Sequence, residues 1–406
     1  MVNLMKKQSP LSPEKLDDTF AETDYIIDEE KGLRRVRPYF FTHHKFALKR
    51  WLGMSVFDMM MKEFSLHIST PEKLNETAER GYMLLNMEKI NASELKERII
   101  KDGDMISTKD HRHEPPIRIE LPTVIADTDE FYVVKKPSSV PIHPVAQYRH
   151  NSLIFLIARE YKVNYHVIHR LDRLTSGLVI FAKTKEVAKR VSKEISDRVV
   201  QKQYLLRVVG KFPEKATCEE SLFEISAKKG IYRVAKDGDD EKKVKTALTN
   251  FELVEFFEDS NESLVRAMPK TGRTHQIRVH TQYLGFPIIN DPVYNDPLFG
   301  KERFLERQQR EDITEDIAVE GLTKSKNWGP KGFKIAEESD TPQMAFEKDP
   351  LCDKCRNTPA DPNQHDLILY LHAQKYSGPN WSFETPLPFW AERDFKTPEY
   401  YKKYLL

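Results

Sequence analysis

The chain has 406 residues, enough for two or three domains, and its 39% hydrophobic and 10% aromatic residues suffice to build their cores. Its 64 basic and 63 acidic residues leave a formal charge of +1, which excludes a uniformly basic nucleic-acid coat but not local basic patches. Three cysteines cannot form a disulfide framework, and we find no apolar span or targeting signal. We therefore expect an intracellular protein without a membrane anchor; cytoplasm and nucleus are favoured, and the mitochondrion stays open.

The N-terminal region divides by charge. Residues 1–31 hold four lysines and eight acidic residues, so we interpret 1–32 as a flexible acidic tail. Residues 33–51 hold six basic and no acidic residues, interleaved with aromatic ones. This pattern in 33–50 predicts a basic aromatic arm suited to single-stranded nucleic acid, because cations track phosphates while rings stack on bases. An arm that packs its aromatic rings on a domain is an equal alternative.

Residues 51–110 predict a small α/β module. An apolar-periodic helix over Trp51–Phe64 and a second helix after Pro71 precede short strands punctuated by Gly81, Asn86 and Gly103-Asp104. This order resembles the S4 RNA-binding domain. A helical module that binds no RNA is the alternative.

Residues 111–406 predict a larger domain of the α+β class with a mixed, largely antiparallel sheet. Helices are predicted at Ser152–Tyr161 and Lys185–Asp197. Strands are predicted at Val124–Ala126, Phe131–Lys135, His166–His169, Ser176–Ala182, Val200–Val209, Leu264–Met268 and Leu367–His372. The segment 300–349, with nine basic and twelve acidic residues and few apolar ones, is predicted to be a charged insertion.

The most informative stretch is HRLDRLTSGL, residues 169–178, which lies between two predicted strands. Asp172 therefore sits on a loop supported by rigid elements, a usual place for a reactive side chain. A lone aspartate in such a loop is more often a turn or capping residue, with the neighbouring arginines in water.

The surrounding motifs overturn that interpretation. HRLDRLTSGL resembles the catalytic motif of pseudouridine synthases of the RluA type, and further elements follow the family's order: KKP with PIHP (135–144), QKQY (201–204), TGRTHQIRVH (271–280), LGFPIINDPVY (284–294) and LYLHA (369–373). The similarity covers about residues 121–300 and 365–390. The finer segments HRHEPP (111–116) and FETPLP (383–388) resemble the eukaryotic branch that modifies tRNA uridine 32.

The resemblance implies isomerisation of uridine to pseudouridine, in which the N1–C1′ bond breaks and the uracil rejoins the ribose through C5. One nucleophilic carboxylate can suffice for this reaction, so we expect no cofactor. Asp172 is the candidate nucleophile, and Arg278 is the partner that keeps it ionised and oriented. Tyr204 would stack on the uracil and could assist removal of the C5 proton; a core tyrosine on a strand is the alternative.

Five further residues are expected to bind substrate. Arg170 is placed to fill the stack vacated by a flipped base, with a structural salt bridge as the alternative. Arg273 could contact phosphate, and His275 and Gln276 belong to the same motif. Leu371 would form an apolar wall, which core packing explains equally well. The expected partner is RNA, most simply tRNA, bound by a monomer with no obligatory protein partner.

Basic residues near these motifs predict the RNA-binding surface. Residues 183–211 hold nine basic and three acidic residues, and 266–280 hold four basic and none acidic. We therefore expect affinity to depend steeply on salt.

Cys352 and Cys355 invite a zinc hypothesis together with His365 and His372. The histidine spacing departs from the usual H-x₃₋₅-H, and His372 belongs to a predicted strand. We therefore expect no metal and a reduced surface turn.

Two alternatives to a tRNA pseudouridine synthase remain, and a third is set aside. The chain could be a non-catalytic RNA-binding protein or chaperone that retains the fold, or its substrate could be rRNA. A glycoside hydrolase of another class needs two flanking carboxylates, and no second acid is suggested beside Asp172.

Overall fold

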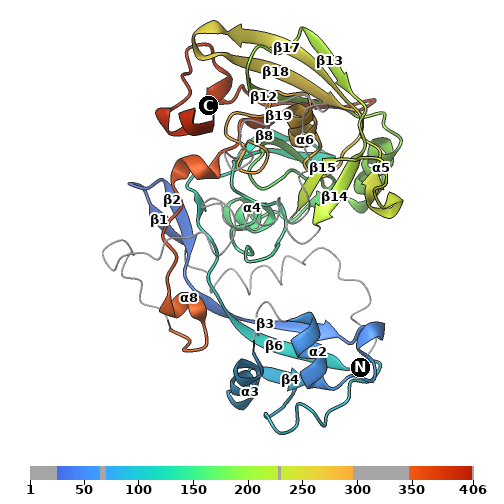
Figure 1. Ribbon diagram of the computed structural model, residues 1–406, viewed down its shortest axis with the longest axis vertical. Coiled ribbons are helices and arrows are strands. Elements are labelled where there is room, and N and C mark those ends of the chain that lie inside the picture. The colour runs from blue at the N-terminus through green and yellow to red at the C-terminus, as the bar shows by residue number, and fades with distance from the viewer. Residues whose placement is uncertain (1–24, 65–69, 227–229, 296–346, 405–406) are drawn as a thin grey trace. The chain divides into compact units, whose positions relative to one another are not determined.

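The computed structural model describes residues 25–64, 70–226, 230–295 and 347–404 (Figure 1). These residues belong to two units. One unit comprises the described residues within Met1–Arg35, Pro115–Lys334 and Asp361–Leu406. The other comprises the described residues within Val36–Glu114 and Ile335–Ala360. We call them the large and the small unit. No helix in the described ranges has both the length and the apolar character that crossing a membrane requires.

The small unit is built on a four-stranded antiparallel sheet in the order β3-β6-β4-β5. The strands are β3 (Tyr39–Phe46), β4 (Met83–Leu85), β5 (Glu88–Lys89) and β6 (Met105–Arg112). Helices α2 (Val56–Glu63) and α3 (Pro71–Glu79) begin at hydroxyl caps, where Ser55 and Thr70 accept hydrogen bonds from backbone amides three residues on. Sheet and helices share one apolar core that includes Trp51, Met59, Leu74 and Ile106.

The large unit carries a ten-stranded sheet in the order β13-β17-β18-β12-β19-β11-β9-β8, with β10 beside β11 and β20 beside β19. Its strands are β8 (Thr123–Asp127), β9 (Phe131–Lys136), β10 (His166–Val167), β11 (Ser176–Ala182), β12 (Gln201–Val209), β13 (Lys215–Cys218), β17 (Thr249–Phe257), β18 (Glu262–Pro269), β19 (Leu371–Ser377) and β20 (Ser382–Glu384). The β11–β19 pair is parallel, and the other pairs are antiparallel. The predicted α+β class with a mixed, largely antiparallel sheet is confirmed.

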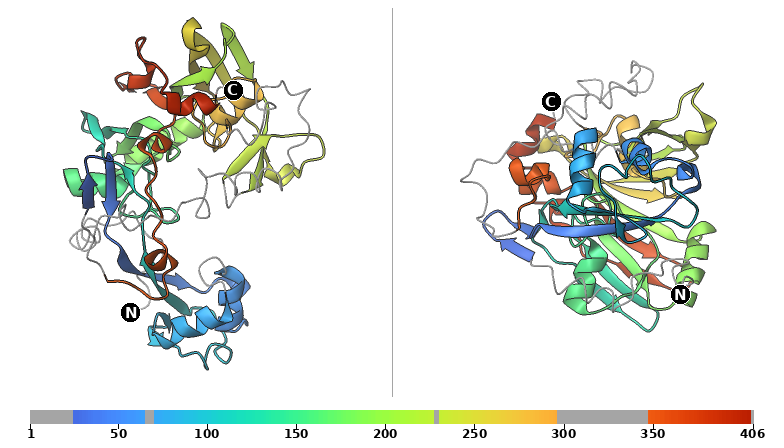
Figure 2. Two further views of the ribbon diagram at one scale, coloured as in Figure 1. Left: turned by 60° about the vertical axis from the view of Figure 1, so that its left-hand side comes forward. Right: turned by 90° about the horizontal axis from the view of Figure 1, so that it is seen from below.

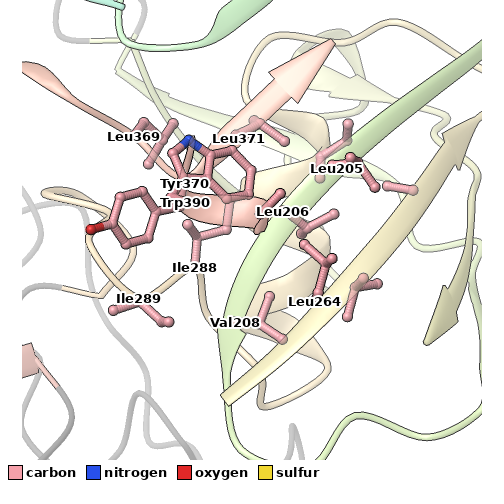
Figure 3. Close-up of a cluster of buried hydrophobic side chains, with 14 of the residues drawn as sticks. Leu205, Leu206, Val208, Leu264, Ile288, Ile289, Leu369, Tyr370, Leu371 and Trp390 are labelled. Carbon is pink, nitrogen blue, oxygen red and sulfur yellow. The ribbon is translucent and has the colours of Figure 1, made fainter. Parts of the chain in front are cut away.

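Helices α4 (Leu153–Tyr161), α5 (Lys185–Ser196) and α6 (Gln276–Tyr283) accompany this sheet, as two further views show (Figure 2). The sheet and helices bury two main apolar clusters. One joins α4 and α5 to β9 and β11. The other joins β12, β18 and β19 to the C-terminal segment, where the Tyr370 and Trp390 rings stack with centroids 5.4 Å apart (Figure 3).

Two smaller sheets complete the large unit. One has the order β1-β2-β7, formed by β1 (Tyr25–Asp28), β2 (Leu33–Val36) and β7 (Ile117–Arg118). The other has the order β15-β14-β16, formed by β14 (Leu222–Ser226), β15 (Ile231–Val234) and β16 (Val244–Lys245). The short helix α8 (Asp353–Arg356) belongs to the small unit.

The predicted domain boundaries differ from those of the structure. Residues 25–28 of the predicted acidic tail form β1, and residues 1–24 lie outside the described residues. The predicted arm 33–50 is divided between β2 and β3, and β3 pairs with β6 along all eight of its residues. These backbone pairings make 33–46 part of two sheets instead of an independent arm. Most of the predicted insertion 300–349 lies outside the described residues.

Candidate active site

The loop that carries Asp172 connects β10 to β11, and a buried lysine binds its backbone. The Nζ atom of Lys136 donates hydrogen bonds to the carbonyls of Val140 (2.8 Å) and Arg173 (3.1 Å), although its side chain is fully buried. The hydroxyl of Ser138 donates to the Leu174 carbonyl at 2.8 Å. The bonds to the Arg173 and Leu174 carbonyls fix the backbone next to Asp172. The loop therefore holds this carboxylate in a set position, with 24% of its side chain exposed.

The same loop runs into a close approach between β11 and β19. Gly177 has φ +113°, and a Cβ atom there would lie 2.3 Å from the Ala373 carbonyl oxygen. Next to it, the Ser176 hydroxyl and His372 are 2.8 Å apart, and His372 also contacts the Thr385 hydroxyl at 2.7 Å. Only glycine fits at position 177, and the motif's glycine is explained by this backbone contact.

Arg278 faces Asp172 from helix α6. Its Nη1 atom lies 3.8 Å from the Asp172 Oδ2 atom, which is an ion pair without a direct hydrogen bond. The other side of the guanidinium donates two bonds to Asp291, at 2.7 and 2.8 Å. Asp291 is fully buried and also accepts bonds from the backbone amides of Val293 and Tyr294. We call these two bonds from Arg278 to Asp291 the clamp. The clamp fixes the direction in which Arg278 points its remaining N–H groups.

The electrostatics of this pair follow from burial and charge. Burial alone lowers the pKa of Arg278, but the charge of Asp291 and the bonds to it outweigh burial, so the net shift is upward. Burial raises the pKa of Asp291, and Arg278 reverses this, so the net shift is downward. Both groups are therefore charged at neutral pH, and Asp172 stands beside a permanent cation.

His275 approaches the same oxygen of the carboxylate as Arg278 does, with its Nε2 atom 3.7 Å from the Asp172 Oδ2 atom. Burial, assisted by the charge of Arg278, lowers the pKa of His275 to about 4, so the ring is neutral at pH 7. Its Nδ1 atom lies 3.0 Å from the Tyr294 hydroxyl. His275 thus offers Asp172 a neutral polar neighbour, and Arg278 remains the charged partner.

Tyr204 on β12 contacts Tyr376 on β19 through a hydroxyl–hydroxyl hydrogen bond, and their ring centroids are 5.9 Å apart. Burial raises the pKa of Tyr204 to about 12, and the nearby charge of Asp172 acts in the same direction. The Tyr204 phenol is therefore protonated at neutral pH. The residue as a whole is only half-buried, and its side chain packs against both apolar clusters of the large unit.

The other residues predicted to bind substrate lie in different surroundings. Arg170 and Arg273 are exposed; Arg273 donates from Nε to the Thr246 carbonyl at 3.0 Å. Gln276 is buried, and both ends of its amide are bonded within the protein, which braces the loop before α6. Leu371 is buried in the apolar cluster of Figure 3. Gln276 and Leu371 therefore contribute to the scaffold of the site.

The predicted basic surface is partly neutralised. Four basic residues of 183–211 pair with acidic side chains, namely Lys183 with Asp127, Arg190 with Glu130, Lys193 with Asp197 and Arg207 with Glu262. A surface hollow lined by residues of the segments 219–221 and 235–246 includes none of the predicted site residues. The exposed basic residues within the motifs, Arg170 and Arg273, are therefore the candidate side chains for binding RNA.

The structure does not bring His365 and His372 to the two C-terminal cysteines as a ligand set. His372 forms hydrogen bonds with the hydroxyls of Ser176 and Thr385. The His365 ring stacks on the Tyr400 ring with centroids 5.5 Å apart.

Sequence reasoning missed two residues of this site. Asp291 was inside a quoted motif but had no role, and its conspicuous signal is a carboxylate next to proline after an apolar run. Tyr376 lies beyond the LYLHA motif, and a polar strand sequence gives no hint of a tyrosine pair. His275, grouped with the substrate-binding residues, instead contacts the candidate nucleophile itself.

Comparisons with known proteins agree with this geometry. Residues 130–283 match the family model of RNA pseudouridylate synthases. The chain is 36% identical to pseudouridylate synthase RPUSD2 of Homo sapiens, covering 94% of this chain and 77% of the relative. It is 34% identical to the mitochondrial tRNA pseudouridine(32) synthase of Saccharomyces cerevisiae, covering 92% and 80%. It is 31% identical to the tRNA pseudouridine(31) synthase of the same yeast, covering 90% and 97%. With these similarities, a carboxylate set against a clamped arginine has its explanation: the chain belongs to the RNA pseudouridylate synthase family.

Proposed function

We propose that this pseudouridine synthase isomerises a uridine in the anticodon loop of tRNA, at position 32, with Asp172 as the nucleophile. The observation that carries the catalytic assignment is the Asp172 carboxylate facing Arg278, which Asp291 holds in place. The tRNA assignment rests on the relatives, two of which are named as tRNA synthases for neighbouring positions 32 and 31.

Asp172 opens the reaction by attacking C1′ or by removing a proton from the ribose beside it. The N1–C1′ bond breaks and the uracil turns. C5 then bonds to C1′ as the Asp172–C1′ bond breaks or, on the second route, as the removed proton returns to the ribose. The proton at C5 is lost and N1 gains one, so substrate and product have the same atoms. The Arg278 guanidinium, 3.8 Å from Asp172, places a positive charge beside the carboxylate without occupying it in a direct hydrogen bond.

Tyr204 is proposed to stack on the uracil while the base is detached. The residue is only partly buried, and the hydrogen bond to Tyr376 anchors the hydroxyl end of its side chain. With a pKa of about 12, its phenol is a hydrogen-bond donor at neutral pH and a poor base. Containment of the free uracil is therefore the main part that Tyr204 plays.

A uridine reaches Asp172 only after leaving the RNA stack, which costs a few kcal/mol and is cheapest in loops. Arg170 is proposed to occupy the vacated space. Its side chain is exposed two residues before Asp172, and no described residue forms an ion pair with it. This arrangement suits a guanidinium that stacks between bases. Arg173 and Arg273 are proposed to contact phosphates of the same loop.

The substrate assignment is tested by mapping pseudouridine in total RNA from cells with and without this protein. We expect loss at uridine 32 of a set of tRNAs, restored by the wild-type chain but not by Asp172→Asn. The compartment of those tRNAs identifies where the protein acts. Loss at position 31, or in rRNA, would contradict the substrate assignment while leaving the synthase activity intact.

A further inference from the structure

The small unit brings two histidines and two cysteines together from distant parts of the chain. His111 lies on β6, and His113 follows just beyond the strand end, so the two side chains share one face. Cys352 is the N-cap of α8 and Cys355 lies within this helix, on one turn closed by a hydrogen bond from the Cys355 amide to the Cys352 carbonyl at 3.1 Å. Figure 1 shows α8 beside the end of this sheet, within the same unit.

Three of the four ligand atoms form a nearly equilateral triangle. The His113 Nε2 atom lies 3.2 Å from the His111 Nδ1 atom and 3.3 Å from the Cys355 Sγ atom, and the latter two atoms are 3.1 Å apart. The Cys352 sulfur completes the group, in which all four ligand atoms lie within 4.8 Å of one another.

These spacings can be compared with the edges of a zinc tetrahedron. Zinc bonds of about 2.0–2.1 Å to nitrogen and about 2.3 Å to sulfur give edges of roughly 3.3 Å between nitrogens and 3.5 Å between nitrogen and sulfur. The observed 3.2 Å between nitrogens and 3.1 and 3.3 Å between nitrogen and sulfur are within about 0.4 Å of those edges. A small outward movement of Cys355 would complete one face of the tetrahedron.

The surroundings position the ligands. Lys354 donates from Nζ to the His113 carbonyl at 3.0 Å, and Lys73 pairs with Asp353 at 3.2 Å, so both flanks of α8 are tied to the small unit. The Phe40 ring packs on His111 with centroids 4.8 Å apart, which restricts rotation of the imidazole. Supporting contacts of this kind orient metal ligands.

We propose that His111, His113, Cys352 and Cys355 form a structural Zn²⁺ site. Two thiolates and two imidazoles are a ligand set that zinc prefers, and four protein ligands leave no open position for a reacting water. The four-residue helix α8 has no buried residues of its own, so apolar packing does little to hold it. The metal would therefore fix the segment around α8 on β6, linking parts of the chain about 240 residues apart.

The site is tested on the full chain, purified in a reducing buffer without chelator, by elemental analysis. We expect about one zinc ion per chain, and a loss of at least 80% of it in His113→Ala and in Cys355→Ser. Cys218→Ala is the matched control, because Cys218 is the chain's remaining cysteine and is buried in the large unit; this variant should keep its zinc.

A spectroscopic readout keeps the test independent of folding losses. Cobalt added to metal-free wild-type protein should give thiolate-to-cobalt charge transfer and the absorption of tetrahedral Co²⁺. Cys355→His, which preserves a ligand, should retain the tetrahedral spectrum with weaker charge transfer. The proposal is overturned by wild-type protein that binds neither metal, by variants with undiminished zinc, or by a Cys352–Cys355 disulfide in the purified chain.

Discussion

Asp291→Asn tests whether the clamp on Arg278, and not merely the presence of an arginine, supports the candidate nucleophile. The substitution keeps the shape of the side chain and removes its charge. Arg278 then loses two charge-assisted bonds of 2.7 and 2.8 Å, and it is left 4% exposed with Asp172 as its nearest charged partner, 3.8 Å away.

Breaking a buried ion pair by removing one partner costs about 3–5 kcal/mol of folding stability. We expect about 3 kcal/mol here, because Arg278 can turn towards Asp172 and recover part of the interaction. That turn brings a direct hydrogen bond onto the nucleophile and misplaces the cation, so kcat should fall by about 100-fold.

The assay is single-turnover release of tritium from RNA carrying [5-³H]uridine, at a temperature where urea titration shows the variant folded. Glu262→Gln is the matched control: it breaks the equally buried Arg207–Glu262 pair, whose side chains are 1% and 0% exposed. This control should lose similar stability and keep its rate within about threefold. Equal losses of rate in both variants would refute the clamp as a catalytic device and reduce it to a stabilising pair.

Three further predictions concern single features of the site. Gly177→Ala should cost more than about 2 kcal/mol in urea denaturation, because its Cβ would meet Ala373 backbone, whereas Gly238→Ala, with φ +88° and open space, should cost less than half as much. Tyr204→Phe keeps the ring and should release tritium at least tenfold faster than Tyr204→Leu. An equal loss of rate in these two variants, relative to wild type, would assign proton removal to the hydroxyl. The free energy of unfolding should fall as pH drops from about 6.5 towards 4, because four histidines that burial holds neutral bind protons only in the unfolded chain. Burial lowers the pKa to about 3 for His169 and His372 and to about 4 for His275 and His280. Urea midpoints measured at pH 7.5 and pH 5 check this.

The sequence predicted the elements with clear periodicity. The hairpin of β8 and β9, the strand β11 and the helix α5 begin and end within two residues of their predicted limits, because alternating or amphipathic patterns and turn residues mark them. Asp172 and Arg278, 106 positions apart, were paired through the family resemblance, and the structure brings them together.

The elements that were wrong or missed depend on long-range contacts. The strand predicted at Leu367–His372 is observed at Leu371–Ser377, because the Asn290 amide bonds the Ile368 carbonyl and the Tyr370 amide and removes them from the ladder. Helix α6 was not predicted, because its buried face carries Gln, Arg, His and Thr in place of an apolar stripe. Polar groups satisfied by distant partners leave no local pattern to read.

The cysteine pair illustrates the same limit. Local spacing suggested His365 and His372 as companions of Cys352 and Cys355, whereas the structure supplies His111 and His113 from β6. A ligand set assembled by tertiary contact is invisible to a rule based on spacing along the chain.

The assignment of the nucleophile is tested most directly by Asp172→Asn, assayed for tritium release from tRNA carrying [5-³H]uridine and, in parallel, for equilibrium binding of the same tRNA. We expect turnover at least 10⁴-fold below wild type, with a dissociation constant within about threefold, since the carboxylate reacts and the surrounding cations bind. An Asp172→Asn variant that forms pseudouridine at more than a tenth of the wild-type rate would remove Asp172 from the reaction.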